Sequence, residues 1–123
     1  QLLPDSGQRF AVEAGELEEA LKAICAFAPK PGSQVTQVTP VVLELGPEAK
    51  LSYQPEGAEE LVEQLASLSW EGAESMRVGL NPHFLLEGCR ALEASPAERI
   101  EGLASAPERP LLLSFGARRL VEV

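Results

Sequence analysis

The sequence predicts an α+β fold in which two adjacent helices pack on antiparallel sheets. Several short segments alternate between apolar and polar residues with a period of two, which is typical of half-buried strands. Two other segments carry apolar residues at helical spacing. The strand-then-helix pattern occurs twice at a constant offset, so that Leu17 of the first helix matches Leu85 of the second. With 123 residues, the chain is long enough for one domain with its own core.

The first half is predicted to begin with a strand and a helix. Phe10 and Val12 share one side of a strand over 9–14, and Gly15 is expected to end it. A helix is then predicted over 16–28, with carboxylates in its first turn, where the helix macrodipole favours anions. Its apolar stripe consists of Leu17, Ala20, Leu21, Ile24 and Phe27.

A hairpin and an ambiguous segment follow. Val41–Leu45 and Lys50–Gln54 flank the turn signal Gly46-Pro47, so they are predicted to pair as a β-hairpin. Residues 59–70 carry leucines at helical spacing and also a period-two pattern that ends at Trp70. Propensity by itself favours a helix in this segment.

The second half repeats the opening pattern. Val78 and Leu80 indicate a strand, Asn81 is the expected N-cap, and Pro82 is the expected first helical residue. The apolar stripe of this second helix consists of Leu85, Gly88, Cys89 and Leu92. Small residues are expected to let the two helices approach closely, namely Ala20, Gly88 and Ala91.

The C-terminal part is predicted to contain two more strands, over 110–115 and 118–123. Residues 95–109 contain two prolines and are predicted to form a loop, with a helical turn over 97–103.

Charge and composition narrow the possible functions. The chain has 10 Lys and Arg against 19 Asp and Glu, a formal charge of −9, which argues against a free-standing nucleic-acid binder. Cys25 and Cys89 have no CxxC spacing and are expected to be small buried apolar residues in a reducing compartment. No apolar run has the length of a membrane span, so we expect a cytoplasmic protein.

Enzyme chemistry has little support. His83 is the single histidine, and it lies six positions from Cys89, nearly on the opposite face of a helix. There is neither a glycine-rich phosphate loop nor a serine elbow. We therefore expect no catalytic residues, no metal site and no cofactor.

The run MRVGLNPHFLLEGCRAL over 76–92 resembles a segment in the third domain of the bacterial sliding clamp, the beta subunit of DNA polymerase III. Leu3-Pro4-Asp5 resembles the linker that leads into that domain, and Phe10 to Phe27 its first strand and helix. Residues 55–72 resemble an acidic strand before a glycine turn, which favours a strand over a helix within 59–70. The loop over 93–108 is longer than in the family, and the closing family strand is absent after Val123.

This resemblance implies one clamp-like domain over 1–123, with a linker at 1–8 and internal repeats at about 9–72 and 76–123. It implies a DNA-replication processivity factor, in which two three-domain subunits form a homodimeric ring around duplex DNA. The ring tethers DNA polymerase and the clamp loader through their short peptides. Duplex DNA would be a partner only of the assembled ring, and a membrane is not a partner.

The resemblance also implies three kinds of site residue. Leu2, Asn81 and Phe84 match the peptide pocket, although Leu2 could instead be a frayed terminus and Phe84 a core aromatic. Ala26 and Phe27 match the subunit interface, with a core position as the alternative for Phe27. Lys22 and Arg90 would face DNA, although Lys22 also suits an ordinary solvated helix face.

A second function remains open. The chain could be a stand-alone clamp-like interaction domain that binds a protein partner without encircling DNA. The charge of −9 favours this alternative.

Overall fold

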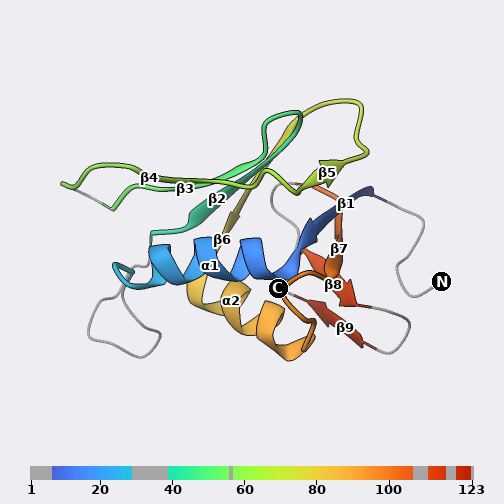
Figure 1. Cartoon of the computed structure of the whole chain (residues 1–123). Helices are drawn as coiled ribbons and strands as arrows, with labels where there is room; N and C mark the ends of the chain where they lie inside the picture. Colours follow the sequence, from blue (N-terminus) through green and yellow to red (C-terminus); the bar gives the residue numbers. More distant parts are fainter. Residues whose placement is uncertain (1–6, 29–38, 56, 107–110, 116–118, 123) are drawn as a thin grey trace.

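Two antiparallel sheets and a pair of helices form the structure, a computed structural model that describes residues 7–28, 39–55, 57–106, 111–115 and 119–122 (Figure 1). The elements are, in chain order, β1 (Gln8–Glu13), α1 (Ala14–Cys25), β2 (Val41–Leu45), β3 (Lys50–Tyr53), β4 (Leu61–Gln64), β5 (Ser69–Trp70), β6 (Met76–Leu80), α2 (Pro82–Ala91), β7 (Arg99–Ala104), β8 (Leu112–Phe115) and β9 (Arg119–Glu122). The order strand, helix, three strands therefore occurs twice, with the short β5 between the two halves.

The two halves are interlocked through their first strands. One sheet has the strand order β5-β1-β7-β8-β9, and the other has the order β4-β3-β2-β6. β1 thus lies in the sheet that the second half builds, and β6 lies in the sheet that the first half builds. Phe10 of β1 is opposite Gly102 of β7, and Gly79 of β6 is opposite Val42 of β2. Neither half completes a sheet by itself.

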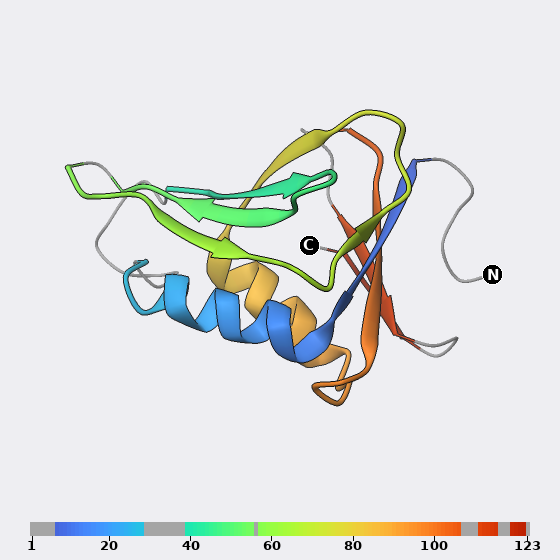
Figure 2. The ribbon, with the colours of Figure 1, turned by 45° about the horizontal axis from the view of Figure 1, so that its top comes forward.

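The helices α1 and α2 lie side by side along one side of the molecule, against the two sheets (Figures 1 and 2). Leu21 and Ile24 of α1 and Leu85 of α2 are almost fully buried in the shared core, as are Leu43 and Leu51 of the sheet. This burial supplies the main favourable term of folding. The predicted α+β fold of two adjacent helices on antiparallel sheets is confirmed, as are the hairpin of β2 and β3 and the strand β6.

The small residues expected between the helices differ in their exposure. Ala20 and Gly88 are buried, as the close approach of α1 and α2 requires. Ala91 is exposed, so the expectation for this residue was wrong.

The largest correction concerns β7, which occupies the centre of its sheet where the sequence predicted a loop with a helical turn. Glycine weakens a strand pattern, and Gly102 stands in the middle of this one. The structure shows why it is there, because a Cβ on Gly102 would overlap the ring of Phe10. With β7, three strands follow α2.

The bounds of α1 also differ from the prediction. Gly15 does not end a strand, because the helix already begins at Ala14. The backbone N–H groups of Ala14 and Gly15 donate to the carbonyls of Glu98 (2.8 Å) and Pro96 (2.9 Å), which satisfies two donors of the first turn. A Cβ on Gly15 would lie 2.8 Å from the Pro96 Cβ, so glycine permits this close approach. The helix ends at Cys25 rather than at residue 28.

Residues 59–70 form neither a helix nor one continuous strand. The strands β4 and β5 are separated by a turn, whose Leu65 is buried. In this turn the Ser67 N–H and Oγ both donate to Glu16 Oε1, at 2.8 and 2.7 Å, and the Glu13 N–H donates to Ser67 Oγ. These hydrogen bonds hold the turn against the start of α1. Residue propensities within the segment cannot indicate such a contact, because its partners are about 50 positions away.

Candidate protein and DNA interfaces

The C-terminal end of α1 and the N-terminal end of α2 are joined by a hydrogen bond. The His83 Nε2 lies 3.0 Å from the Ala28 carbonyl oxygen, across 55 residues of sequence. A carbonyl can only accept, so Nε2 carries the proton in this bond. The neighbouring residues Phe27 and Phe84 therefore occupy the same end of the helix pair.

Both phenylalanines are exposed. The exposed fraction is 68% for Phe27 and 51% for Phe84, so neither is the core aromatic that the sequence left as an alternative. Phe27 lies in the turn after α1 rather than on the helix, and Ala26, the C-cap residue, is also exposed. Exposed aromatic side chains of this size are common anchors in protein interfaces.

Asn81 sets the direction of the first turn of α2. Its Oδ1 accepts hydrogen bonds from the backbone N–H groups of His83 (3.0 Å) and Phe84 (3.2 Å), and Pro82 is the first helical residue. The predicted N-cap is therefore confirmed. Asn81 lies beside Phe84, whereas Leu2, the third predicted pocket residue, lies outside the described residues.

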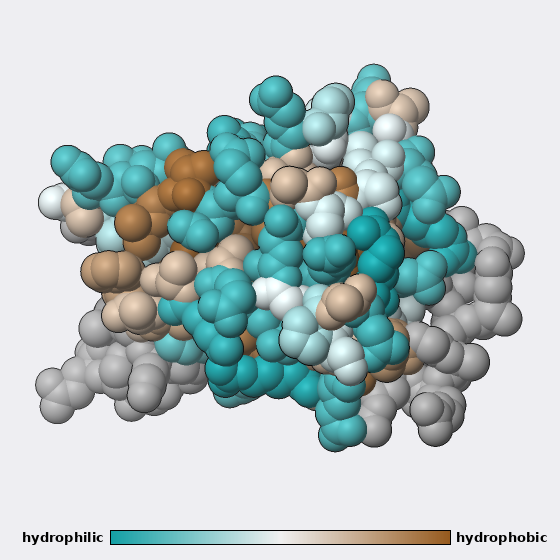
Figure 3. All heavy atoms as spheres, viewed as in Figure 1, coloured by the Kyte–Doolittle hydropathy of each residue, from teal (hydrophilic) through white to brown (hydrophobic). Residues whose placement is uncertain are grey.

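An apolar and acidic sheet edge lies near the turn after α1, and sequence reasoning did not single it out. β4 is the outer strand of its sheet, and Val62 on it is 38% exposed. Figure 3 shows hydrophobic surface over β4 and towards the end of α1. Glu59 and Glu60 precede the strand and are exposed, and Glu63 is half-buried. The sequence feature that could have indicated this surface is Val62, an apolar residue on the exposed side of β4.

Lys22 and Arg90, the two basic residues of the helices, both have negative charge nearby. The Nζ of Lys22 forms an ion pair with Glu19 Oε1 at 3.3 Å, and the side chains are about half exposed for Lys22 and mostly exposed for Glu19. Lys22 and Arg90 each lie in the last turn of their helix, where a cation offsets the negative end of the macrodipole. Arg90 is exposed, with Glu87 one turn before it on α2.

Both cysteines of the helices have thiols with a raised pKa. Burial, with a smaller contribution from Glu18, raises the pKa of the Cys89 thiol to about 12. Burial also raises the pKa of the half-buried Cys25, and Arg90 partly offsets this effect. A thiol with a raised pKa is a poor nucleophile at neutral pH. Neither cysteine is therefore prepared for covalent chemistry.

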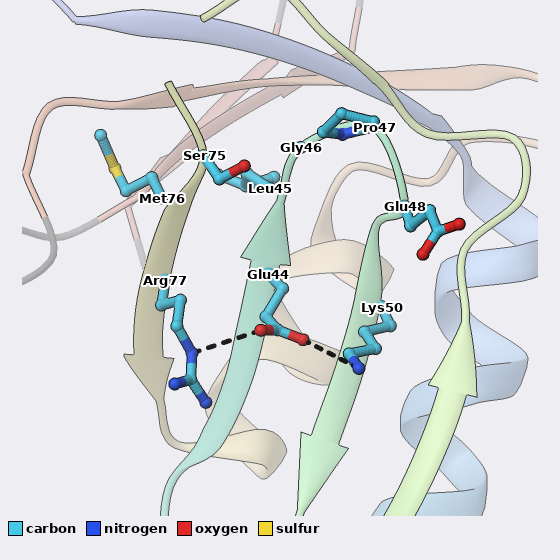
Figure 4. Close-up of a pocket in the computed structure, with 9 residues that line it drawn as sticks. All are labelled: Glu44, Leu45, Gly46, Pro47, Glu48, Lys50, Ser75, Met76 and Arg77. Atoms are coloured by element: carbon cyan, nitrogen blue, oxygen red, sulfur yellow. Dashed lines mark ion pairs between the residues drawn. The ribbon is translucent and has the colours of Figure 1, made fainter. Parts of the chain in front are cut away.

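The outer side of the β2–β3 hairpin carries a hollow of about 450 Å³ near the start of β6. Figure 4 shows Glu44 between two cations, with Oε2 3.3 Å from Lys50 Nζ and Oε1 3.4 Å from Arg77 Nε. Both cations are direct cross-strand neighbours of Glu44. The charges of these three side chains are paired with one another, and the two ion pairs connect β2 to β3 and to β6.

Within the described ranges, no group of three or more His, Cys, Asp or Glu side chains is placed to hold a metal ion. No helix in the described part of the chain is long and apolar enough to cross a membrane.

The chain is similar to solved structures of bacterial sliding clamps. The DNA polymerase sliding clamp from Caulobacter crescentus matches with a TM-score of 0.71 at 20% identity, over 91% of this chain and 27% of the clamp. The beta subunit of the DNA polymerase of Streptococcus pyogenes matches with a TM-score of 0.76 at 20% identity, over 99% and 32%. The DNA polymerase III beta subunit of Thermotoga maritima gives 0.73 at 18% identity, over 99% and 32%.

These likenesses establish the fold. The chain has the fold of a sliding-clamp domain and spans about a third of the length of the clamps that it matches. No protein-family model matches the sequence, and no curated protein matches it.

Proposed function

We propose that this chain is one domain of a DNA sliding clamp, a non-enzymatic replication processivity factor that acts in the cytoplasm. The observation that carries the proposal is the match of 91–99% of the chain to clamps whose TM-scores are 0.71–0.76. Residues 1–123 then form a single domain, with the linker at 1–8 and internal repeats at about 9–72 and 76–123. A ring around duplex DNA keeps the bound polymerase next to its template. Each new encounter of polymerase with template is then intramolecular, and the effective concentration of the polymerase at the template is high.

Ring closure in this proposal uses the end of α1 and the free side of β4. Phe27 is the apolar anchor, with Ala26 beside it, and Val62 extends the apolar surface. An outer strand presents unpaired backbone groups that a strand of the neighbouring subunit can continue. Glu59 and Glu60 beside it favour a basic partner surface, so the contact is head to tail rather than between two copies of β4.

Peptide binding in this proposal uses the first turn of α2. Phe84 is the aromatic at the rim, Asn81 caps the turn that carries it, and Leu2 is the third residue proposed for the pocket. The partners are short peptides of DNA polymerase and of the clamp loader. The half-exposed ring of Phe84 supports this role, because a pocket aromatic must be accessible to its ligand.

The DNA-facing surface in this proposal is the helix pair, with Lys22 and Arg90 as its basic residues. Duplex DNA is bound only by the assembled homodimeric ring, since the chain by itself carries a charge of −9. Contacts of this kind go to phosphates and do not select a sequence.

Retention on DNA circles tests the ring. The assembled protein, loaded by its clamp loader, is expected to stay on a nicked circle at high salt and to leave after the circle is linearised. Equal retention on both forms would contradict encirclement. Binding of polymerase peptides without any retention on circles would instead support the stand-alone interaction domain.

A further inference from the structure

The outer edge of β5 is available for strand pairing. Among the described strands, β5 is the outermost one of its sheet and pairs with β1 on one side (Figure 1). The Glu71 N–H donates to the Arg9 carbonyl oxygen at 2.9 Å, so the backbone groups of Glu71 face β1. In an antiparallel pair, successive residues direct their N–H and C=O groups to alternate sides of the strand. The N–H and C=O of Trp70 therefore point away from β1, where an added strand can pair with them.

The indole of Trp70 is held in one position on the turn that follows β5. Its Nε1 donates to the Glu74 carbonyl oxygen at 3.1 Å. A Cβ on Gly72 would overlap the indole ring, so the ring lies directly against the Gly72 backbone. Trp70 is only partly buried, at the border of the core. A ring that is already ordered loses little conformational entropy when a ligand packs against it.

A hollow of about 440 Å³ opens beside the indole. Trp70 and Leu68 line it, together with Pro47 from the turn between β2 and β3. Figure 4 shows Pro47 at the tip of that turn, apart from the ion pairs of Glu44. An apolar side chain of a strand added to β5 would have room in this hollow, and its burial would add to the modest contribution of the backbone hydrogen bonds.

The acidic side chains at this hollow favour a basic ligand. Glu74 lines the hollow, Glu48 follows Pro47 on the turn, and both side chains are exposed. The two cations of the hairpin are already paired with Glu44. Negative charge beside an apolar hollow attracts a ligand that carries cations next to its apolar centre.

The two arginines near β5 lie on the other face of the sheet. Arg99 donates to Ser69 Oγ at 3.1 Å. Successive side chains of a strand point to opposite faces, so Ser69 and Arg9 face away from the side that holds Trp70 and the buried Phe10. These cations therefore do not offset the carboxylates at the hollow.

We propose that these features form a binding surface for a short extended segment of a partner protein, with an apolar centre flanked by Lys or Arg. The backbone of the segment continues the sheet at Trp70. Its apolar side chain packs between the indole and Pro47, and its cations lie near Glu48 and Glu74.

This surface is separate from those of the proposed clamp function. It adjoins the turn whose Ser67 is bonded to Glu16 at the start of α1. Phe27 and Phe84 lie at the other end of this helix, which is about 18 Å long. Failure of the circle experiment would therefore leave this binding surface untouched.

Titration with synthetic peptides tests the surface. The probe is a capped peptide with a run of valines between lysines, and its charge control carries glutamates in place of the lysines. Trp70 is the single tryptophan, so its emission reports binding directly. We expect the lysine peptide to change this emission, with saturation below about 1 mM, and to shift the amide signals of Ser69, Trp70 and Glu74. The glutamate peptide is expected to bind at least about threefold more weakly.

Modified variants and peptides give matched controls. The variant E48K/E74K is expected to prefer the glutamate peptide, whereas E59K/E60K, with the same change of charge beside β4, is expected to keep the wild-type preference. All four side chains are exposed, so thermal unfolding is expected to stay close to wild type. A lysine peptide that is N-methylated at every valine cannot donate to the sheet edge, and it is expected to lose most of its affinity.

Several results would overturn the proposal. One is the absence of amide shifts at about 1 mM lysine peptide, and another is a set of shifts confined to β4 around Val62. Equal binding of the N-methylated peptide would exclude strand addition, and an unchanged preference of E48K/E74K would exclude the assigned charge contacts. A dimer of the peptide-free chain in ultracentrifugation, formed with a change in Trp70 emission, would assign this edge to a second copy instead.

Discussion

At the scale of single residues, two positions require glycine because a neighbouring side chain leaves no room for a Cβ atom. Gly102 accommodates the ring of Phe10 across the strand pair β1 and β7, and Gly15 accommodates Pro96. By contrast, Gly79 on β6 has only ordinary contacts, with the nearest Pro40 carbon 3.7 Å from an added Cβ. The same residue type is thus required at one strand position and replaceable at another.

Gly102→Ala is expected to destabilise the fold by about 1–3 kcal/mol or more, because Phe10 is 2% exposed and has no free space into which to move. Chemical denaturation followed by Trp70 fluorescence measures the free energy of unfolding. Gly79→Ala is the matched control, and we expect its effect to stay within about 0.5 kcal/mol. Equal stabilities of the two variants would contradict the assigned packing of Phe10.

At the scale of elements, the first turn of α2 combines a cap, an exposed aromatic and a link to α1. The Asn81 side chain satisfies two backbone donors, a contribution of typically about 1 kcal/mol to helix stability. The His83 bond to Ala28 holds this turn against the end of α1. Phe84 is therefore displayed from a fixed backbone, which lowers the entropic cost of binding a ligand.

Phe84→Ala is expected to weaken binding of a polymerase-type peptide at least about tenfold, because anchor aromatics often contribute about 2 kcal/mol or more. Its unfolding free energy should change little, since the ring is half exposed. An NMR titration of the wild type should shift the amide signals of Leu2 and Phe84. Val62→Ala, on a different surface, is the control, and peptide shifts confined to β4 would refute the pocket.

At the scale of the whole molecule, the exposed large apolar residues of the described part of the chain gather at the joined ends of the helices and on β4. On β4 they lie beside the carboxylates of Glu59 and Glu60. A charge of −9 keeps such a protein soluble in spite of these patches. The apolar patches are then free to serve association.

Phe27→Arg is expected to leave the unfolding free energy within about 0.5 kcal/mol of wild type, because the side chain is 68% exposed. It should raise the dissociation constant of the full-length homodimer at least about tenfold, since it places a charge in an apolar contact. Analytical ultracentrifugation measures this constant, and Ala73→Arg, at another exposed position, is the control. Loss of folding in the Phe27 variant would show that the residue supports the core.

The sequence by itself determined the elements whose signal is local. Alternation located β6, helical spacing located α1 and α2, and Asn81-Pro82 located the start of α2, because caps and amphipathic faces depend on neighbours a few positions away. The exposure of Phe27 and Phe84 was left open, since an aromatic near a helix end suits a core as well as an interface.

Only the tertiary structure decided features that depend on distant partners. β7 is a strand because β1 and β8 pair with it and Phe10 fills the space above Gly102, 92 positions away in the chain. The turn between β4 and β5 is set by Glu16, and the shared end of the two helices is set by His83 and Ala28. Long-range packing and hydrogen bonds outweigh propensities of less than about 1 kcal/mol per residue, so a local pattern could not reveal them.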